Sequence, residues 1–100
     1  MIDQTLPETA GLDARRKRLL FRATHRGTHE TDLLVGGYVA PRLAALSEAE
    51  LTAIEAVLEL PDVDLADWLS GRRPIPDEYA ATPLPAMRAA ALERSDRARA

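Results

Sequence analysis

The sequence predicts an all-α fold, a small compact bundle of about five short helices. The chain has 100 residues, which is enough for one small domain with a single hydrophobic core. Alanine supplies 18 of its 46 apolar residues, and only four residues are aromatic. Alanine favours closely packed helices, whereas strands prefer β-branched and aromatic side chains. The composition therefore argues against an all-β fold.

The first helix is expected from Asp13 to about His25, after a flexible arm at residues 1–12. The arm contains a proline and a glycine and shows no apolar periodicity. Asp13 is a suitable N-cap because its carboxylate can accept from the free N–H groups of the first turn. Gly27 follows where a residue in the left-handed conformation would close the helix.

A second apolar stretch, from Leu33 to Leu46, has helix-like spacing. It contains Gly36, Gly37 and Pro41, which are poor helix formers in a helix interior. We therefore expect a helix that is kinked or interrupted between residues 36 and 41.

The third helix is predicted by a capping box at Ser47-Glu48-Ala49-Glu50, and Pro61 ends it. Its apolar residues recur at helical spacing: Leu51, Ile54, Val57 and Leu58. A short fourth helix is capped by Asp62 or Asp64 and stopped by Gly71. We expect its Trp68 to be the main aromatic residue of the core, because apolar leucines lie beside it.

The last part of the chain is expected to be a C-terminal extension, partly helical, over residues 81–100. A loop made extended by its prolines precedes it, with a turn of helix around Tyr79. Pro83 and Pro85 are expected to interrupt any helix that begins there. The following residues favour helix but are expected to bury little beyond Met87 and Leu92, and therefore to fray.

Charge is unevenly distributed along the chain, whose net charge is −3. Residues 15–26 hold six cations and no acid, whereas residues 43–71 hold seven acids and no cation. The two segments could hold each other together, form solvated helix faces, or each attract a partner. If free, the basic helix 15–26 would suit a nucleic-acid-binding or regulatory module. The acidic second half argues against that alternative.

Catalytic and metal chemistry have little support in the sequence. There is no cysteine, and no serine shows an elbow motif or a paired base. His25, His29 and Glu30 lie close in sequence, but Gly27 is expected to separate the histidines and no further ligand is evident. We therefore expect no catalytic residue, no metal site and no enzyme activity.

The location of the protein is expected to be cytoplasmic. The longest stretch without a charge, residues 33–41, is far shorter than the roughly 20 residues that span a bilayer. The first residues are acidic and lack the basic and apolar regions of a signal peptide. We therefore expect no membrane insertion.

Residues Arg26-Gly27-Thr28-His29-Glu30, here called the signature turn, resemble the Arg-Gly-x-x-Glu signature of the SdhE-type FAD assembly factors. These form the succinate dehydrogenase assembly factor 2 family. A basic helix precedes the signature, and further matches follow in order: Asp32, Leu46-Ser47, Leu60-Pro61-Asp62, Asp64-Leu65, Asp67-Trp68 and Pro74. The resemblance covers about residues 14 to 79. Many members carry a basic residue and a methionine where this chain has His25 and Thr28.

The resemblance implies a helical flavinylation-factor domain at residues 13–80. Such a factor binds the flavoprotein subunit of succinate dehydrogenase, and often that of fumarate reductase, and promotes covalent attachment of FAD to it. No cofactor is expected to be bound stably by the factor itself, since the partner handles FAD, and the free factor is expected to be a monomer. The expected partner-binding residues comprise three matched positions of the signature and four neighbours: Arg26, Gly27 and Glu30, with Arg22, His25, His29 and Asp32.

The signature turn also has a purely structural interpretation. Gly27 could serve only to end a helix, Arg26 to interact with the C-terminal dipole of that helix, and Glu30 with the N-terminus of the next. This interpretation needs no partner.

Overall fold

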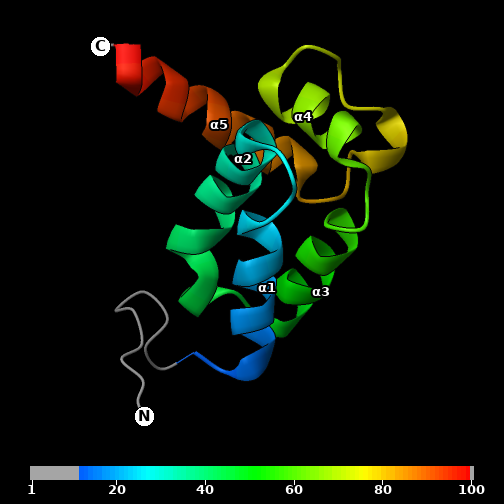
Figure 1. Cartoon of the computed structure of the whole chain (residues 1–100). Helices are drawn as coiled ribbons and strands as arrows, with labels where there is room; N and C mark the ends of the chain where they lie inside the picture. Colours follow the sequence, from blue (N-terminus) through cyan, green and yellow to red (C-terminus); the bar gives the residue numbers. More distant parts are fainter. Residues whose placement is uncertain (1–11, 100) are drawn as a thin grey trace.

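The computed structural model describes residues 12–99, which form a bundle of five α-helices and two 3₁₀ helices (Figure 1). In chain order these are α1 (Ala14–Thr24), α2 (His29–Val39), η2 (Ala40–Ala45), α3 (Glu48–Val57), α4 (Asp62–Ser70), η3 (Asp77–Tyr79) and α5 (Leu84–Arg99). The described residues contain no strand, and the predicted all-α class is confirmed. Residues 1–11 of the predicted arm lie outside the described part of the chain.

The caps predicted for α1 and α3 are present. The predicted cap of α4 by Asp62 or Asp64 is wrong, because the extended Pro61 takes the N-cap position without a side-chain hydrogen bond and both aspartates lie in the first turn of the helix. Asp13 accepts from the N–H of Arg16 at 2.9 Å and caps α1. Ser47 and Glu50 form the reciprocal capping box that begins α3, at 3.1 and 2.8 Å. Gly71 ends α4 with φ of 88°, a left-handed conformation that glycine adopts at little cost.

Helix α2 is the central element, packed against α1, α4 and α5. Its Gly36 lies where α1 crosses, and a Cβ there would stand 2.8 Å from Cγ2 of Thr24 and 3.4 Å from the carbonyl oxygen of Ala23. The absence of a side chain at this position therefore sets how closely α1 and α2 approach. The glycine pair does not break the helix.

The predicted interruption of the second helix lies at its end. The α-helix stops at Val39 and the chain continues as the 3₁₀ helix η2, with Pro41 near its start. Proline suits that place because the N–H groups of a first helical turn need no intrahelical partner. The expectation of a break between residues 36 and 41 is confirmed.

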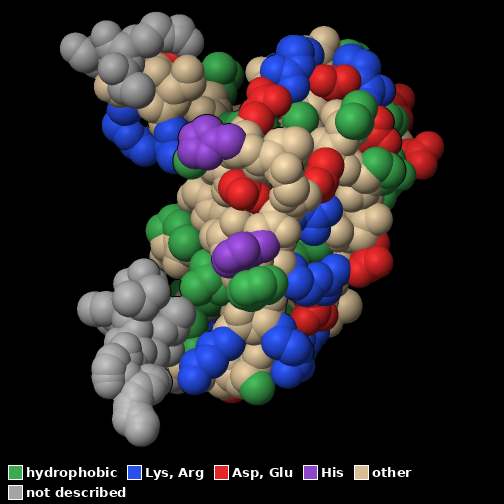
Figure 2. All heavy atoms as spheres, in the orientation of Figure 1, with side chains coloured by type: hydrophobic (Ala, Val, Ile, Leu, Met, Phe, Trp, Pro, Cys, Tyr) green, Lys and Arg blue, Asp and Glu red, His purple; other side chains and the backbone are tan. Residues whose placement is uncertain are grey.

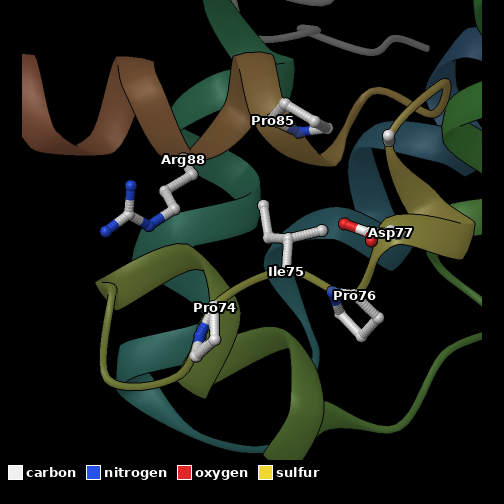
Figure 3. Close-up of a pocket in the computed structure, with 7 residues that line it drawn as sticks. Pro74, Ile75, Pro76, Asp77, Pro85 and Arg88 are labelled. Atoms are coloured by element: carbon white, nitrogen blue, oxygen red, sulfur yellow. The ribbon is translucent and has the colours of Figure 1, made fainter.

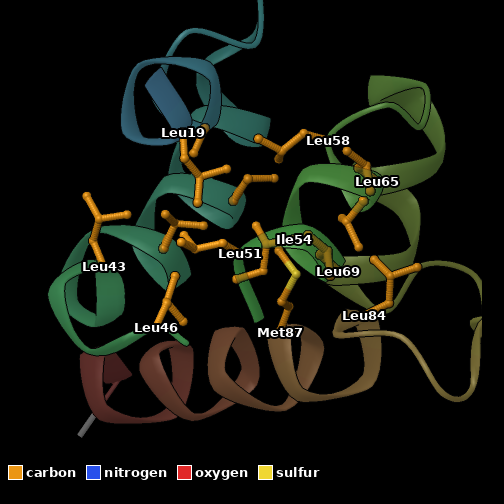
Figure 4. Packing of buried hydrophobic residues seen from close by; sticks show 14 of the residues in the cluster. Leu19, Leu43, Leu46, Leu51, Ile54, Leu58, Leu65, Leu69, Leu84 and Met87 are labelled. Carbon is orange, nitrogen blue, oxygen red and sulfur yellow. The ribbon is translucent and has the colours of Figure 1, made fainter. Parts of the chain in front are cut away.

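The core lies between the helices and is built mainly from leucine and valine (Figure 4). Helix α3 contributes the predicted stripe of Leu51, Ile54 and Val57, and α4 contributes Leu65 and Leu69. Trp68 is 5% exposed, so its assignment to the core is confirmed.

Helix α5 begins earlier than the prolines suggested. Pro83 supplies the carbonyl that accepts from Met87 N–H at 2.9 Å, and Pro85 occupies the first turn. The prolines therefore start the helix, and the expected interruption is wrong. Leu84 and Met87 are fully buried, whereas Leu92, expected to be buried, is 53% exposed.

Arginines of α1 connect this helix to the acidic half of the chain. Arg15 pairs with Glu48 at 2.6 Å and with Glu55 at 2.8 Å, and Arg22 pairs with Glu59 at 2.5 Å. The guanidinium of Arg16 donates to the carbonyls of Leu43 and Leu46, which end η2. The basic and acidic segments thus hold each other together, and much of the positive charge of α1 is used inside the molecule.

The two adjacent glycines of α2 give a matched pair for testing the α1–α2 contact. We expect Gly36→Ala to destabilise the protein by roughly 1–2 kcal/mol, because overpacking outweighs the gain in helix propensity. Thr24 cannot easily yield, since it is β-branched and its hydroxyl donates to the Leu20 carbonyl at 2.8 Å.

Gly37→Ala is the control for this prediction. A Cβ there would meet only the flexible end of Arg94, at 3.1 Å. We expect it to leave stability unchanged or to raise it by up to about 1 kcal/mol. Urea denaturation of both variants measures the difference, and equal effects would refute the close-approach argument.

Candidate functional site

The signature turn connects α1 to α2 and is fixed by local capping (Figure 1). Gly27 has φ of 111°, which side-chain-bearing residues rarely adopt, as expected for the residue that reverses the chain here. Thr28 is the N-cap of α2, and its Oγ1 accepts from the N–H of Thr31 at 3.1 Å. Thr31 is buried, and its hydroxyl lies 2.5 Å from that of Thr28.

Arg26 points into the molecule. Its guanidinium donates to Oδ1 of Asp62, the first residue of α4, at 2.9 Å and to the Leu60 carbonyl at 3.3 Å. Its backbone N–H donates to Oδ1 of Asp32 at 2.5 Å. Arg26 therefore attaches the turn to α4, and Asp32 fixes the backbone of the turn from α2.

Glu30 faces a residue that is distant in sequence. Arg72 donates from both Nη atoms to its two carboxylate oxygens, at 2.8 and 2.9 Å. Arg72 also donates to Asp67 at 3.0 Å, and Arg73 bonds Asp67 at 2.8 Å and Asp64 at 2.6 Å. We call these five residues the ion-pair chain. Figure 2 shows acidic and basic side chains interleaved over α4 and the loop that follows it.

The ion-pair chain shifts the titration of its members. The hydrogen bonds from Arg72 hold the pKa of Glu30 below its usual range. The pKa of Asp67 is lowered first by the hydrogen bond from Arg73 and then by that from Arg72. Both carboxylates stay ionised at neutral pH, and their pairs weaken as the pH falls through the lowered pKa values.

The other predicted site residues lie around the turn in different settings. His29 is exposed at the start of α2. His25 follows α1 and is stacked on Phe21, with ring centroids 3.9 Å apart. Arg22 lies on α1 and pairs with Glu59, so it is directed toward the end of α3 rather than toward the turn.

The structure thus brings Arg26, Gly27, Glu30 and Asp32 together at one turn. Sequence reasoning missed Asp62 and Arg72, which hold two of these residues. The pair Arg72-Arg73 directly after an acid-rich helix was the available signal for the ion-pair chain. Nothing in the sequence indicates the contact between Arg26 and Asp62, since 36 positions separate them.

The described part of the chain has several hollows on its surface. One hollow lies between residues 74–77 and the start of α5, where Asp77 and Arg88 stand at opposite ends of a lining made mainly of proline and isoleucine (Figure 3). Within the described residues, no group of three or more His, Asp or Glu side chains is placed to hold a metal ion. No helix in that part of the chain is both long and apolar enough to cross a bilayer.

The inward placement of Arg26 predicts a structural role for its side chain. We expect Arg26→Ala and Asp62→Ala each to destabilise the protein by about 1–3 kcal/mol, because each removes a partner from a mostly buried, charge-assisted hydrogen bond. The double variant should cost less than the sum of the two single variants. Denaturant unfolding of the four proteins measures this coupling, and strict additivity would contradict the contact.

The ion pair of Glu30 gives a second prediction. We expect Arg72→Gln to raise the pKa of Glu30 toward the ordinary value of 4.5, because the hydrogen bonds that favour the carboxylate are lost. NMR titration of the Glu30 carboxyl carbon measures the shift. Arg73→Gln, which leaves Arg72 in place, is the control. An identical Glu30 pKa with and without Arg72 would show that the pair does not persist in solution.

Comparison with known proteins identifies relatives of this chain. The family model described as "Flavinator of succinate dehydrogenase" matches residues 17–90, which include the signature turn and the ion-pair chain. The FAD assembly factor SdhE of Acetobacter pasteurianus is 55% identical over 73 residues, which are 73% of this chain and 66% of that protein.

Two further relatives match a similar share of this chain at lower identity. A protein of Dictyostelium discoideum named succinate dehydrogenase assembly factor 2, mitochondrial, is 31% identical over 72% of this chain and 51% of its own length. Its namesake in Mycosarcoma maydis is 40% identical over 63% of this chain and 26% of its own length. The chain therefore spans two thirds or less of the length of these relatives. Since the family model covers well over half of the chain, this protein belongs to the family of flavinators of succinate dehydrogenase.

Proposed function

We propose that this protein is an assembly factor that binds the flavoprotein subunit of succinate dehydrogenase and promotes the covalent attachment of FAD to that subunit. Family membership and the names of its relatives support this proposal. We extend it to a non-catalytic, cytoplasmic factor that is a monomer when free. The bond-forming chemistry then belongs to the flavoprotein and its flavin.

The observation that carries the proposal is an exposed turn that is held by hydrogen bonds from two helices. The signature turn is fixed from α2 by Asp32 and from α4 by Asp62, and Thr28 caps the helix that follows. Gly27, Thr28, His29 and Glu30 are nevertheless exposed. An exposed turn that is already ordered loses little conformational entropy when a partner binds it.

Gly27 supplies a place where a partner's backbone can approach closely. A Cβ at this position would meet only Oδ2 of Asp62, at 3.7 Å, so the remaining space is open. Contact at this point would stabilise a flavoprotein conformation in which the flavin and the side chain to which it becomes attached are aligned. Alignment of reacting groups can lower a barrier by several kcal/mol without any catalytic group on the factor.

FAD is expected to stay with the flavoprotein throughout. The hollow between residues 74–77 and the start of α5 is open to solvent, and three of the five cations of α1 bond to carboxylates or carbonyls of the same molecule. These features support a factor that acts through protein contact. The proposal therefore assigns no stably bound cofactor to this chain.

Covalent flavin in the flavoprotein subunit tests the proposal. We expect in-gel flavin fluorescence of the denatured subunit to fall by roughly tenfold or more in cells that lack this protein or carry Gly27→Arg. The arginine side chain would occupy the open space at the turn, which we propose the partner uses. Fluorescence of the unchanged strain is the reference.

The control for this experiment must separate docking from stability. Gly27→Arg places a side chain at a positive φ and is expected to lower the free energy of unfolding by about 1–2 kcal/mol. Ile54→Val, in the core part of α3, is expected to lower it by a similar amount, roughly 0.5–1.5 kcal/mol, and leaves the turn unchanged. Ile54→Val should therefore preserve flavinylation. If deletion of the protein leaves covalent flavin unchanged, the proposed function fails.

A further inference from the structure

We propose that Arg72 is the cation through which the signature turn contacts its partner, and that Glu30 is a positioning residue that holds Arg72 beside the turn. This inference rests on the proposed function. It assigns to the docking surface a residue that lies 42 positions from Glu30.

The arginine of the signature itself is poorly placed for a partner. The Arg26 side chain is only 12% exposed, and its guanidinium is directed at Asp62 and the Leu60 carbonyl. A partner could reach it only by displacing α4 from the turn. Its contacts therefore serve the fold, and the turn needs another source of outward-facing donors.

Arg72 meets this need. Its side chain is 51% exposed, and three of its five N–H donors are used, two by Glu30 and one by Asp67. Two donors thus remain without a partner among the described residues. The guanidinium is held by Glu30 on α2 and by Asp67 on α4. Because the side chain of Arg72 is already ordered by these contacts, it loses less conformational entropy when a partner binds.

The local charge indicates the chemistry of the partner group. The ion-pair chain contains three carboxylates and two guanidinium groups, a formal net charge of −1. An incoming carboxylate would face Glu30 and Asp67 at close range, whereas a carbonyl oxygen carries no net charge. We therefore assign the free donors of Arg72 to backbone carbonyl oxygens of the flavoprotein, as at an exposed loop or a helix C-terminus.

The pairing with Arg72 makes Glu30 a positioning residue and not a direct contact of the partner. With Arg72 bound in a fork, the Glu30 carboxylate is engaged within the molecule and orients the guanidinium. If Glu30 instead bound a cation of the partner directly, Arg72 would compete with that cation. Removing Arg72 would then leave binding unchanged or strengthen it.

A double-mutant cycle on the full chain tests the inference. The affinity and the association and dissociation rates for the isolated flavoprotein subunit of succinate dehydrogenase are measured by biolayer interferometry. The proteins are the unchanged chain, Arg72→Gln, Glu30→Gln and the double variant. We expect Arg72→Gln to weaken binding on the order of tenfold or more, mainly by faster dissociation.

Glu30→Gln should weaken binding less, and the double variant should match Arg72→Gln within about twofold, since Glu30 acts through Arg72. Arg72→Lys keeps the charge but loses the planar fork, and should restore only part of the affinity. The control is Arg73→Gln, a neighbouring arginine of similar exposure that shares Asp67 but does not touch Glu30. Thermal unfolding verifies that each variant is folded.

Three outcomes would overturn the inference: full affinity of Arg72→Gln, an equal loss with Arg73→Gln, or additive losses in the cycle. These outcomes differ from failure of the proposed function itself. That failure would appear as an unchanged chain that does not bind the flavoprotein, or as Gly27→Arg binding as tightly as the unchanged chain.

Discussion

The contact between Arg26 and Asp62 is the interaction on which the geometry of the exposed turn depends. It joins the end of the basic segment to the first residue of α4, across 36 positions of sequence. Because α4 is fixed there, Arg72 at its far end can reach Glu30 on the other side of the turn. Burial of the guanidinium makes this tie stronger than the half-exposed pairs elsewhere on the surface. The polar side chains of the turn thus have a structural role before any partner is considered.

The uneven charge of the chain has a related explanation. Arg15 and Arg22 meet acids of α3 or its end, while Arg16 supports the carbonyls that end η2. These contacts link α1 to η2, to α3 and to the residues that follow α3, in addition to the apolar core. Four of the six cations in the segment that suggested nucleic-acid binding bond to groups of the same molecule: Arg15, Arg16, Arg22 and Arg26.

Much of this structure follows from local sequence rules. The capping box at Ser47, the N-cap at Asp13 and the left-handed glycines at 27 and 71 each depend on neighbours a few residues away, so they could be predicted. Pro83 and Pro85 could not be interpreted as easily, because proline both starts and breaks helices and only packing decides between them. The partners of Arg26 and Glu30 could not be predicted, because contacts between side chains 36 or 42 positions apart produce no recognisable pattern in the sequence. The position of the turn was therefore predictable, but the direction of its side chains was not.

The long span of these contacts also affects the order in which the surface forms during synthesis. When residues 26–30 leave the ribosome, Asp62 and Arg72 have not yet emerged from it, so the turn lacks both of its distant hydrogen-bond partners. Two hydrogen bonds from Arg26 and the fork on Glu30 become possible only after α4 and the loop behind it have emerged. The ordered turn is consequently a property of the nearly complete chain, and its appearance reports that the domain has folded.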